Sequence, residues 1–72
     1  MVVTFRTTED ALLAESICKE KHLPGRMIPV PPGIHGECGL AWRMPLSSEE
    51  DFRRECLRLV EPEGFFEQEF RY

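Results

Sequence analysis

The sequence lacks any long hydrophobic run and any excess of basic residues. Its apolar stretches are far shorter than the ~20 residues that a membrane-spanning helix needs. It carries 9 Lys and Arg against 13 Asp and Glu, a net charge of -4, whereas binding to a phosphate backbone needs clustered cations. Its aromatic residues are not interleaved with basic ones, as they are in surfaces that stack single-stranded bases. We therefore expect neither a membrane nor a nucleic acid as a partner.

Cysteine is also scarce, and its spacing does not match a zinc motif. The chain has 3 cysteines, Cys18, Cys38 and Cys56, and no Cys-x-x-Cys pair. An odd, small number of cysteines favours free thiols in a reducing compartment over a disulfide framework. The amino terminus has neither the basic segment nor the long apolar stretch of a signal peptide. We expect a cytoplasmic protein that holds no metal.

The length limits what the chain can build. With 72 residues we expect a single domain spanning residues 1–72, because domains typically have 50–250 residues. A chain of this size buries only about 60% of the surface that its unfolded form exposes, so its core is thin. A deep substrate cavity is not expected, and a chemical site should lie on a loop.

Apolar periodicity and turn residues divide the chain into six elements. Thr8, Glu9 and Asp10 provide a helix N-cap and acidic first turn, and Ser47 with Glu50 matches a capping box. Prolines restrict the second strand to a sheet edge. The pattern predicts, in order, a strand over 2–5, a helix over 8–21, strands over 26–32 and 40–44, a helix from 47 to Pro62, and a strand over 65–72.

The order β-α-β-β-α-β predicts an α+β domain with the ferredoxin-like split βαβ sandwich. In this fold two right-handed crossovers build a four-stranded antiparallel sheet with two helices on one face. The strand order is 4-1-3-2, which places the proline-containing second strand and the charged last strand at the edges. The local pattern and the global topology agree with each other.

The three cysteines occupy two kinds of setting. Cys18 and Cys56 lie on the apolar faces of the predicted helices, where free cysteine usually packs as a small hydrophobic residue. The two sulfurs come close if both helices cover one sheet face, although no spacing rule supports a redox role. Cys38 instead lies in a glycine-rich loop just before a central strand, so we expect a partly accessible thiol.

The surroundings of Cys38 suggest a reactive thiol. Gly36 and Gly39 permit backbone conformations that can turn N–H groups toward a sulfur anion. Candidate cationic neighbours are His35 in the same loop, Arg43 on the following strand and Arg26 on the neighbouring strand, and a cation beside a thiol favours the nucleophilic thiolate. Glu37 opposes this effect, because a neighbouring carboxylate disfavours the thiolate. The competing interpretation is a loop cysteine that merely packs under the proline segment.

One segment carries a family resemblance. The run Cys38-Gly39-Leu40-Ala41-Trp42-Arg43 resembles the Cys-Gly-x-Ala-x-Arg signature of the putative selenium/sulfur carrier protein-like family of short bacterial proteins, and residues 24–31 match that family as well. The resemblance implies a carrier whose signature cysteine holds sulfur or selenium as a persulfide or selenopersulfide. It makes Cys38 the acceptor, Gly39 the close-approach glycine and Arg43 the nearby basic residue.

We therefore expect a sulfur or selenium carrier, with at most the activity of a sulfurtransferase-type carrier and no cofactor. Its partners would be a protein donor, such as a cysteine desulfurase or a sulfurtransferase, and an unidentified acceptor. One alternative is a non-catalytic interaction or regulatory module, in which an edge strand pairs with a partner or with a second copy as a homodimer. Another is a thiol redox sensor. Cys38→Ser abolishes a relay but leaves an interaction module intact.

Overall fold

The computed structural model describes residues 1–67, and these form one sheet covered by two helices. The four strands lie in the order β2-β3-β1-β4, and every neighbouring pair is antiparallel. This is the predicted order read from the other edge, so the ferredoxin-like α+β fold is confirmed. The elements are β1 (Val2–Thr4), α1 (Thr8–Glu20), β2 (Arg26–Pro29), β3 (Leu40–Arg43), a 3₁₀ turn (Leu46–Ser48), α2 (Glu49–Cys56) and β4 (Gly64–Phe66).

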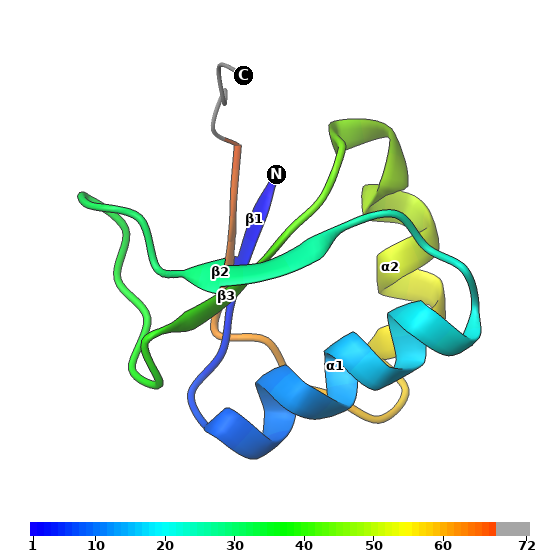
Figure 1. The fold of residues 1–72 in the computed structure, drawn as a ribbon, viewed down its shortest axis with the longest axis horizontal. Helices are drawn as coiled ribbons and strands as arrows, with labels where there is room; N and C mark the ends of the chain where they lie inside the picture. The colour runs from blue at the N-terminus through cyan, green and yellow to red at the C-terminus, as the bar shows by residue number, and fades with distance from the viewer. Residues whose placement is uncertain (68–72) are drawn as a thin grey trace.

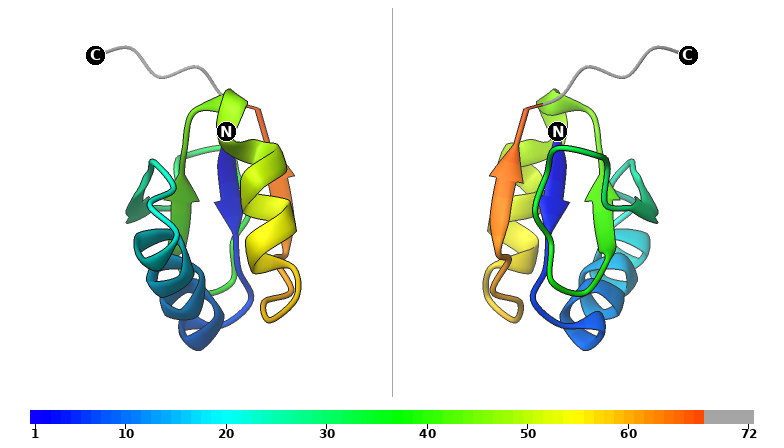
Figure 2. Two further views of the ribbon diagram at one scale, coloured as in Figure 1. Left: turned by 90° about the vertical axis from the view of Figure 1, so that its right-hand side faces the viewer. Right: turned by 90° about the vertical axis from the view of Figure 1, so that its left-hand side faces the viewer.

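The two faces of the sheet are covered by different parts of the chain. Figures 1 and 2 show both helices on one face and the loop between β2 and β3 on the other. Cross-strand partners share a face because side chains alternate along each strand. One row that faces the helices therefore consists of Met27, Trp42, Val3 and Phe65. The rows on either side of it, which include Thr4 and Arg43, face the loop side.

Helix α1 has defined capping at both ends. It begins at Thr8, as predicted, but its N-cap is Thr7, whose hydroxyl accepts the Asp10 N–H at 3.1 Å. At the other end, His22 adopts a left-handed conformation with φ 57°. The Leu23 N–H then donates to the Cys18 carbonyl at 2.8 Å, which is the bond that defines a Schellman motif. This motif ends the helix before the Pro24-Gly25 turn.

The second helix differs from its prediction at both ends. The capping box at Ser47 is wrong: a 3₁₀ turn over Leu46–Ser48 occupies this stretch, and α2 starts at Glu49 with no side-chain cap. The turn forms because the Ser48 N–H donates to the Pro45 carbonyl at 2.9 Å. Helix α2 ends at Cys56 rather than at Pro62. The predicted last strand over 65–72 is found as β4, and residues 68–72 lie outside the described part of the chain.

Aromatic packing joins the helices to the sheet. Phe52 of α2 is fully buried, and its ring meets that of Phe65 edge-on, with centroids 6.0 Å apart. The Arg53 guanidinium stacks 3.8 Å from the centroid of the Phe65 ring, a cation–π contact. Gly25 lies so close to Trp42 that an added Cβ would be 2.6 Å from the indole ring.

None of the helices among the described residues is long and apolar enough to cross a bilayer.

Candidate functional site

The candidate site is the loop that joins β2 to β3 (residues 30–39). Its two ends are tied together, because the Val30 N–H donates to the Gly39 carbonyl at 3.0 Å. The Gly39 N–H donates in turn to the Gly36 carbonyl at 3.3 Å. Gly39 has a φ of 79°, a conformation that favours glycine. Gly39 therefore forms the turn into β3. It is not the close-approach glycine that the resemblance implied, because a Cβ at this position would meet nothing within 4 Å.

Gly36 anchors the loop on the sheet. A Cβ at this position would lie 2.8 Å from a methyl of Val30 and 3.3 Å from the Cβ of Thr4. Thr4 is fully buried and faces the side of the sheet away from the helices. The backbone of the loop therefore lies directly on β1, where only glycine leaves enough room. This close approach covers the sheet face that neither α1 nor α2 covers.

Cys38 lies at the point where the loop meets the end of β1. Its N–H donates to the Phe5 carbonyl at 3.4 Å, and its side chain packs partly against the core. The thiol donates to the Leu40 carbonyl at 3.4 Å, and the sulfur accepts the Leu40 N–H at the same distance. The sulfur is thus half-buried, and the two hydrogen bonds to the Leu40 backbone fix its orientation. The glycine-rich pattern predicted a backbone N–H directed at the sulfur without naming the residue, and the structure shows that it is the N–H of Leu40.

Glu63 connects this loop to β4. One carboxylate oxygen accepts the Glu37 N–H at 3.0 Å, and the other lies 3.5 Å from Nε2 of His35. The Glu63 N–H itself donates to the Thr4 carbonyl at 2.8 Å. Glu63 thereby connects β1, the start of β4 and the residue that precedes Cys38. His35 contacts this carboxylate, and its predicted place beside the thiol stays a prediction.

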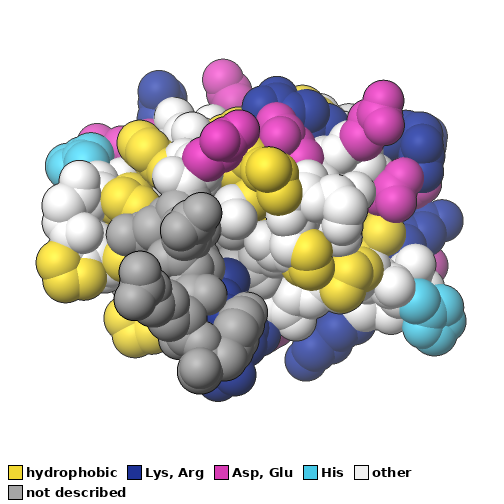
Figure 3. Space-filling model, turned by 90° about the horizontal axis from the view of Figure 1, so that it is seen from above, with side chains coloured by type: hydrophobic (Ala, Val, Ile, Leu, Met, Phe, Trp, Pro, Cys, Tyr) yellow, Lys and Arg dark blue, Asp and Glu magenta, His cyan; other side chains and the backbone are white. Residues whose placement is uncertain are grey.

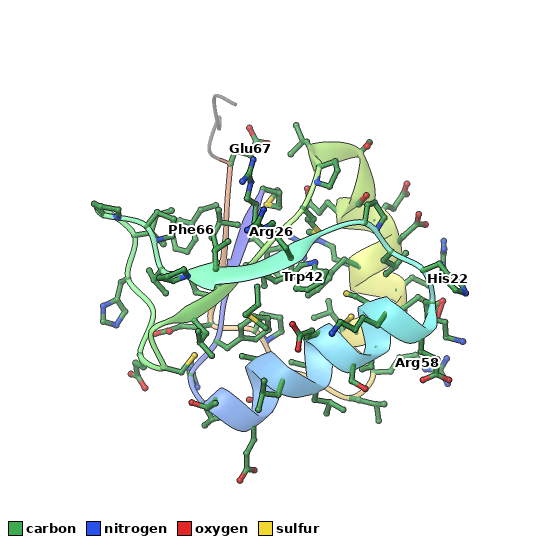
Figure 4. The ribbon with its side chains drawn as sticks, viewed as in Figure 1. His22, Arg26, Trp42, Arg58, Phe66 and Glu67 are labelled. Atoms are coloured by element: carbon green, nitrogen blue, oxygen red, sulfur yellow. The ribbon has the colours of Figure 1, made fainter. Side chains whose placement is uncertain are left out.

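The two arginines lie together, toward the other end of β3. Arg26 and Arg43 are direct partners across β2 and β3, and Arg43 is three residues beyond Leu40, which corresponds to about 10 Å along a strand. Figure 4 shows Arg26 and Trp42 on opposite sides of the sheet. Both arginines line a hollow of about 240 Å³ with Pro24 and Met44. Their role beside the sulfur stays a prediction.

A comparison with protein-family models places the chain among known sequences. The model described as "Putative Se/S carrier protein-like" matches residues 1–67. The chain belongs to this family. Searches of curated proteins and of solved structures found no match. The family match covers β1 through β4 and therefore includes the whole loop of Cys38.

This Se/S carrier family member has two further cysteines, which the structure places in the core as predicted. Cys18 and Cys56 are fully buried, and their sulfur atoms lie 3.9 Å apart. Burial raises the pKa of Cys18 to about 12, with further contributions from the charge and the hydrogen bond of Cys56. Burial also raises the pKa of Cys56. Both thiols are therefore protonated at neutral pH, and both are fully buried, whereas Cys38 is only half-buried.

One group of potential metal ligands lies among residues 1–67. His35, Glu37 and Glu63 each offer one ligand atom, and these atoms lie within 4.8 Å of one another. The His35 side chain is 80% exposed, and Glu63 already accepts a backbone N–H. We therefore interpret the group as contacts that hold the loop.

Figure 3 shows one face of the protein, on which acidic and basic side chains are interspersed over the described residues.

Proposed function

We propose that this protein carries sulfur or selenium on Cys38, as a persulfide or a selenopersulfide. The observation that carries the proposal is the contrast among the cysteines: Cys18 and Cys56 are buried, and Cys38 is partly exposed on a loop. The family match supports the same class of function. A carrier needs one thiol that larger proteins can reach. Cys38 best meets this requirement.

The proposed chemistry is two successive exchanges at sulfur. The Cys38 thiolate attacks the outer sulfur of a donor persulfide, so that a new S–S bond forms and the donor's S–S bond breaks. The donor cysteine leaves as a thiolate and takes up a proton. An acceptor thiolate then attacks the outer sulfur on Cys38 and releases Cys38 as the leaving thiolate. These steps depend on thiolate fraction, leaving-group pKa and access, as in thiol–disulfide exchange.

The loop geometry suits this exchange. The backbone N–H of Leu40 points at the sulfur of Cys38 and can donate to it whether the thiol is protonated or not. A Cβ at Gly39 would point into open space, so this glycine leaves no side chain beside the turn that could block an approaching protein. The exchange needs no cofactor and no enclosed cavity, which fits a thin domain with a reactive group on its surface. A cysteine desulfurase or a sulfurtransferase is the class of donor that we propose.

The proposal is tested by measuring the intact mass after the reduced protein is incubated with a cysteine desulfurase and cysteine. We expect a gain of one sulfur atom that a reducing agent removes. Cys38→Ser should show no gain, whereas Cys18→Ala, the control for a core cysteine, should still gain one sulfur atom. Replacing cysteine with selenocysteine tests whether selenium is carried. A gain that persists in Cys38→Ser would contradict the proposal.

Absence of a gain is also informative when it is combined with alkylation. If Cys38 reacts readily with iodoacetamide but never accepts sulfur from the desulfurase, carriage is contradicted for this donor class. An inorganic polysulfide then provides a donor that needs no protein docking. Failure with both donors would exclude the relay and favour the interaction module.

A further inference from the structure

The pair formed by Cys18 and Cys56 takes no part in the proposed relay. Cys18 lies in the last turns of α1 and Cys56 is the last residue of α2, 38 positions further along the chain. Their sulfur atoms are 3.9 Å apart and share a hydrogen bond. Both residues are fully buried in the hydrophobic core between the helices and the sheet. The fold thus brings two thiols from separate helices into direct contact.

This separation is close to that of a disulfide. A disulfide bond has an S–S length of about 2.05 Å, so the sulfur atoms must approach by roughly 1.9 Å, a change on the scale of a small side-chain rotation with slight helix adjustment. Each cysteine lies near the carboxyl end of its helix, where backbone hydrogen bonds open most readily. Leu57 and Leu59, which follow Cys56, are exposed. The pair is therefore placed where a local adjustment can bring the sulfurs together.

We propose that Cys18 and Cys56 form a redox modification site, at which a hydroperoxide oxidises the dithiol to an internal disulfide that links α1 to α2. In the first step one thiolate attacks a peroxide oxygen, which yields a sulfenic acid and one molecule of water or alcohol. The second thiol then attacks the sulfenic sulfur, forming the S–S bond and releasing water. The two thiols lose two protons and two electrons, and the hydroperoxide is reduced to one water and one further molecule of water or alcohol.

Burial determines when this reaction occurs. Because burial raises the pKa of both thiols, the closed core contains almost no thiolate at neutral pH, and the thiolate is the form that reacts. Oxidation therefore proceeds through the transient opening of a helix end. Once formed, the disulfide restricts the unfolded chain across the 38-residue separation. We expect the midpoint of thermal unfolding to rise by at least about 8 °C relative to the reduced protein.

The inference is independent of carriage on Cys38, and the experiment separates the two. Cys38→Ser protein, which retains the buried pair, is treated with hydrogen peroxide and analysed by intact mass without reduction. We expect the loss of two hydrogen atoms, with peptide mapping that joins the Cys18 peptide to the Cys56 peptide. A thermal melt of the same sample, with and without a reducing agent, measures the rise in midpoint. Cys38→Ser combined with Cys56→Ala is the control and should not form the internal link.

A second preparation keeps the test decisive where oxidation of the native protein is slow. The Cys38→Ser protein is unfolded, then refolded in a glutathione redox buffer, which lets the pair equilibrate without attack on the closed core. A Cys18–Cys56 disulfide in the refolded protein supports the inference. It is overturned if the thiols stay reduced under both treatments, or if the linked form melts at a lower temperature than the reduced form. If Cys56→Ala does not fold, Cys18→Ala serves as the control.

Discussion

Removing the carboxylate of Glu63 should loosen the Cys38 loop without unfolding the domain. Glu63 accepts the Glu37 N–H at 3.0 Å and lies 3.5 Å from His35. Glu63→Ala deletes both contacts, whereas Glu63→Gln keeps a side-chain oxygen that can still accept the N–H. We therefore expect the alanine variant to have the larger effect and the glutamine variant to fall between it and the native protein.

The size of the effect follows from the exposure of the partners. A hydrogen bond to a charged group contributes about 1.5–3 kcal/mol where it is well shielded, and the Glu63 side chain is only 16% exposed. Glu37 is exposed, which reduces this contribution, and the contact with the exposed His35 side chain adds at most roughly 1 kcal/mol. Together these contacts favour the closed loop by about 1–2 kcal/mol, which corresponds to a factor of about 5–30 in the open population.

The assay is the rate at which iodoacetamide alkylates Cys38, followed by intact mass at a fixed pH. Because the sulfur is half-buried and hydrogen-bonded to the Leu40 backbone, its alkylation rate reports the open population of the loop. Glu63→Ala should react about 5–30-fold faster than the native protein. Glu61→Ala, which removes an exposed carboxylate two residues away, is the matched control and should leave the rate unchanged.

Two results would refute this reasoning. Equal alkylation rates in Glu63→Ala and the native protein would show that the carboxylate does not hold the loop. A faster rate accompanied by an equally large loss of global stability in chemical denaturation would show that the whole domain had loosened rather than the loop alone.

Three further predictions concern stability. His22→Gly should raise the free energy of unfolding by up to about 1 kcal/mol in chemical denaturation, because glycine adopts the left-handed conformation without strain, and His22→Ala should bring no such gain. Gly25→Ala should lower it by at least about 2 kcal/mol, since the added methyl collides with Trp42 and the backbone φ of 149° is strained for alanine; an unchanged midpoint would contradict the close approach. Burial raises the pKa of Cys18 from 9.0 to about 12, so the stability that depends on its protonated form is complete below pH 9 and is lost as the pH rises toward 12. Urea titrations above pH 9 should show a loss of about 1.4 kcal/mol per pH unit and a smaller slope in Cys18→Ala.

The fold could be predicted because its signals are local and mutually consistent. Prolines in the second strand and charge in the last strand identified the sheet edges, and the turn residues near Pro24 and Pro45 divided the chain. Helix termini were predicted less well. Ser47 with Glu50 has the sequence of a capping box, yet the backbone after Pro45 forms a 3₁₀ turn first. Whether a 3₁₀ turn or a capping box forms here depends on the direction in which the chain leaves β3, and a short sequence motif carries no information about that direction.

The site could be predicted in part. The glycine-rich setting of Cys38 predicted a partly accessible loop thiol, which the structure shows, while its role as the acceptor stays a prediction. The close approach expected at Gly39 is found at Gly36 instead. Glu63 could not be found, because it lies 26 positions from Glu37 and becomes a neighbour only when β4 pairs with β1. Once the sheet order is known, its place just before β4 is a usable signal. The pairing of Arg26 with Arg43 likewise depends on register, which a shift of one residue would change.

The most direct test of carriage on Cys38 is to locate the transferred sulfur and then to follow its release. The protein is charged with a cysteine desulfurase and cysteine, separated from the enzyme, and trapped with an alkylating reagent, and peptide mapping then covers all three cysteines. We predict sulfane sulfur on the Cys38 peptide alone and its loss when a thiol acceptor is added before trapping. Sulfur found on Cys18 or Cys56, or sulfur on Cys38 that no thiol can remove, would contradict the role of Cys38 as a carrier.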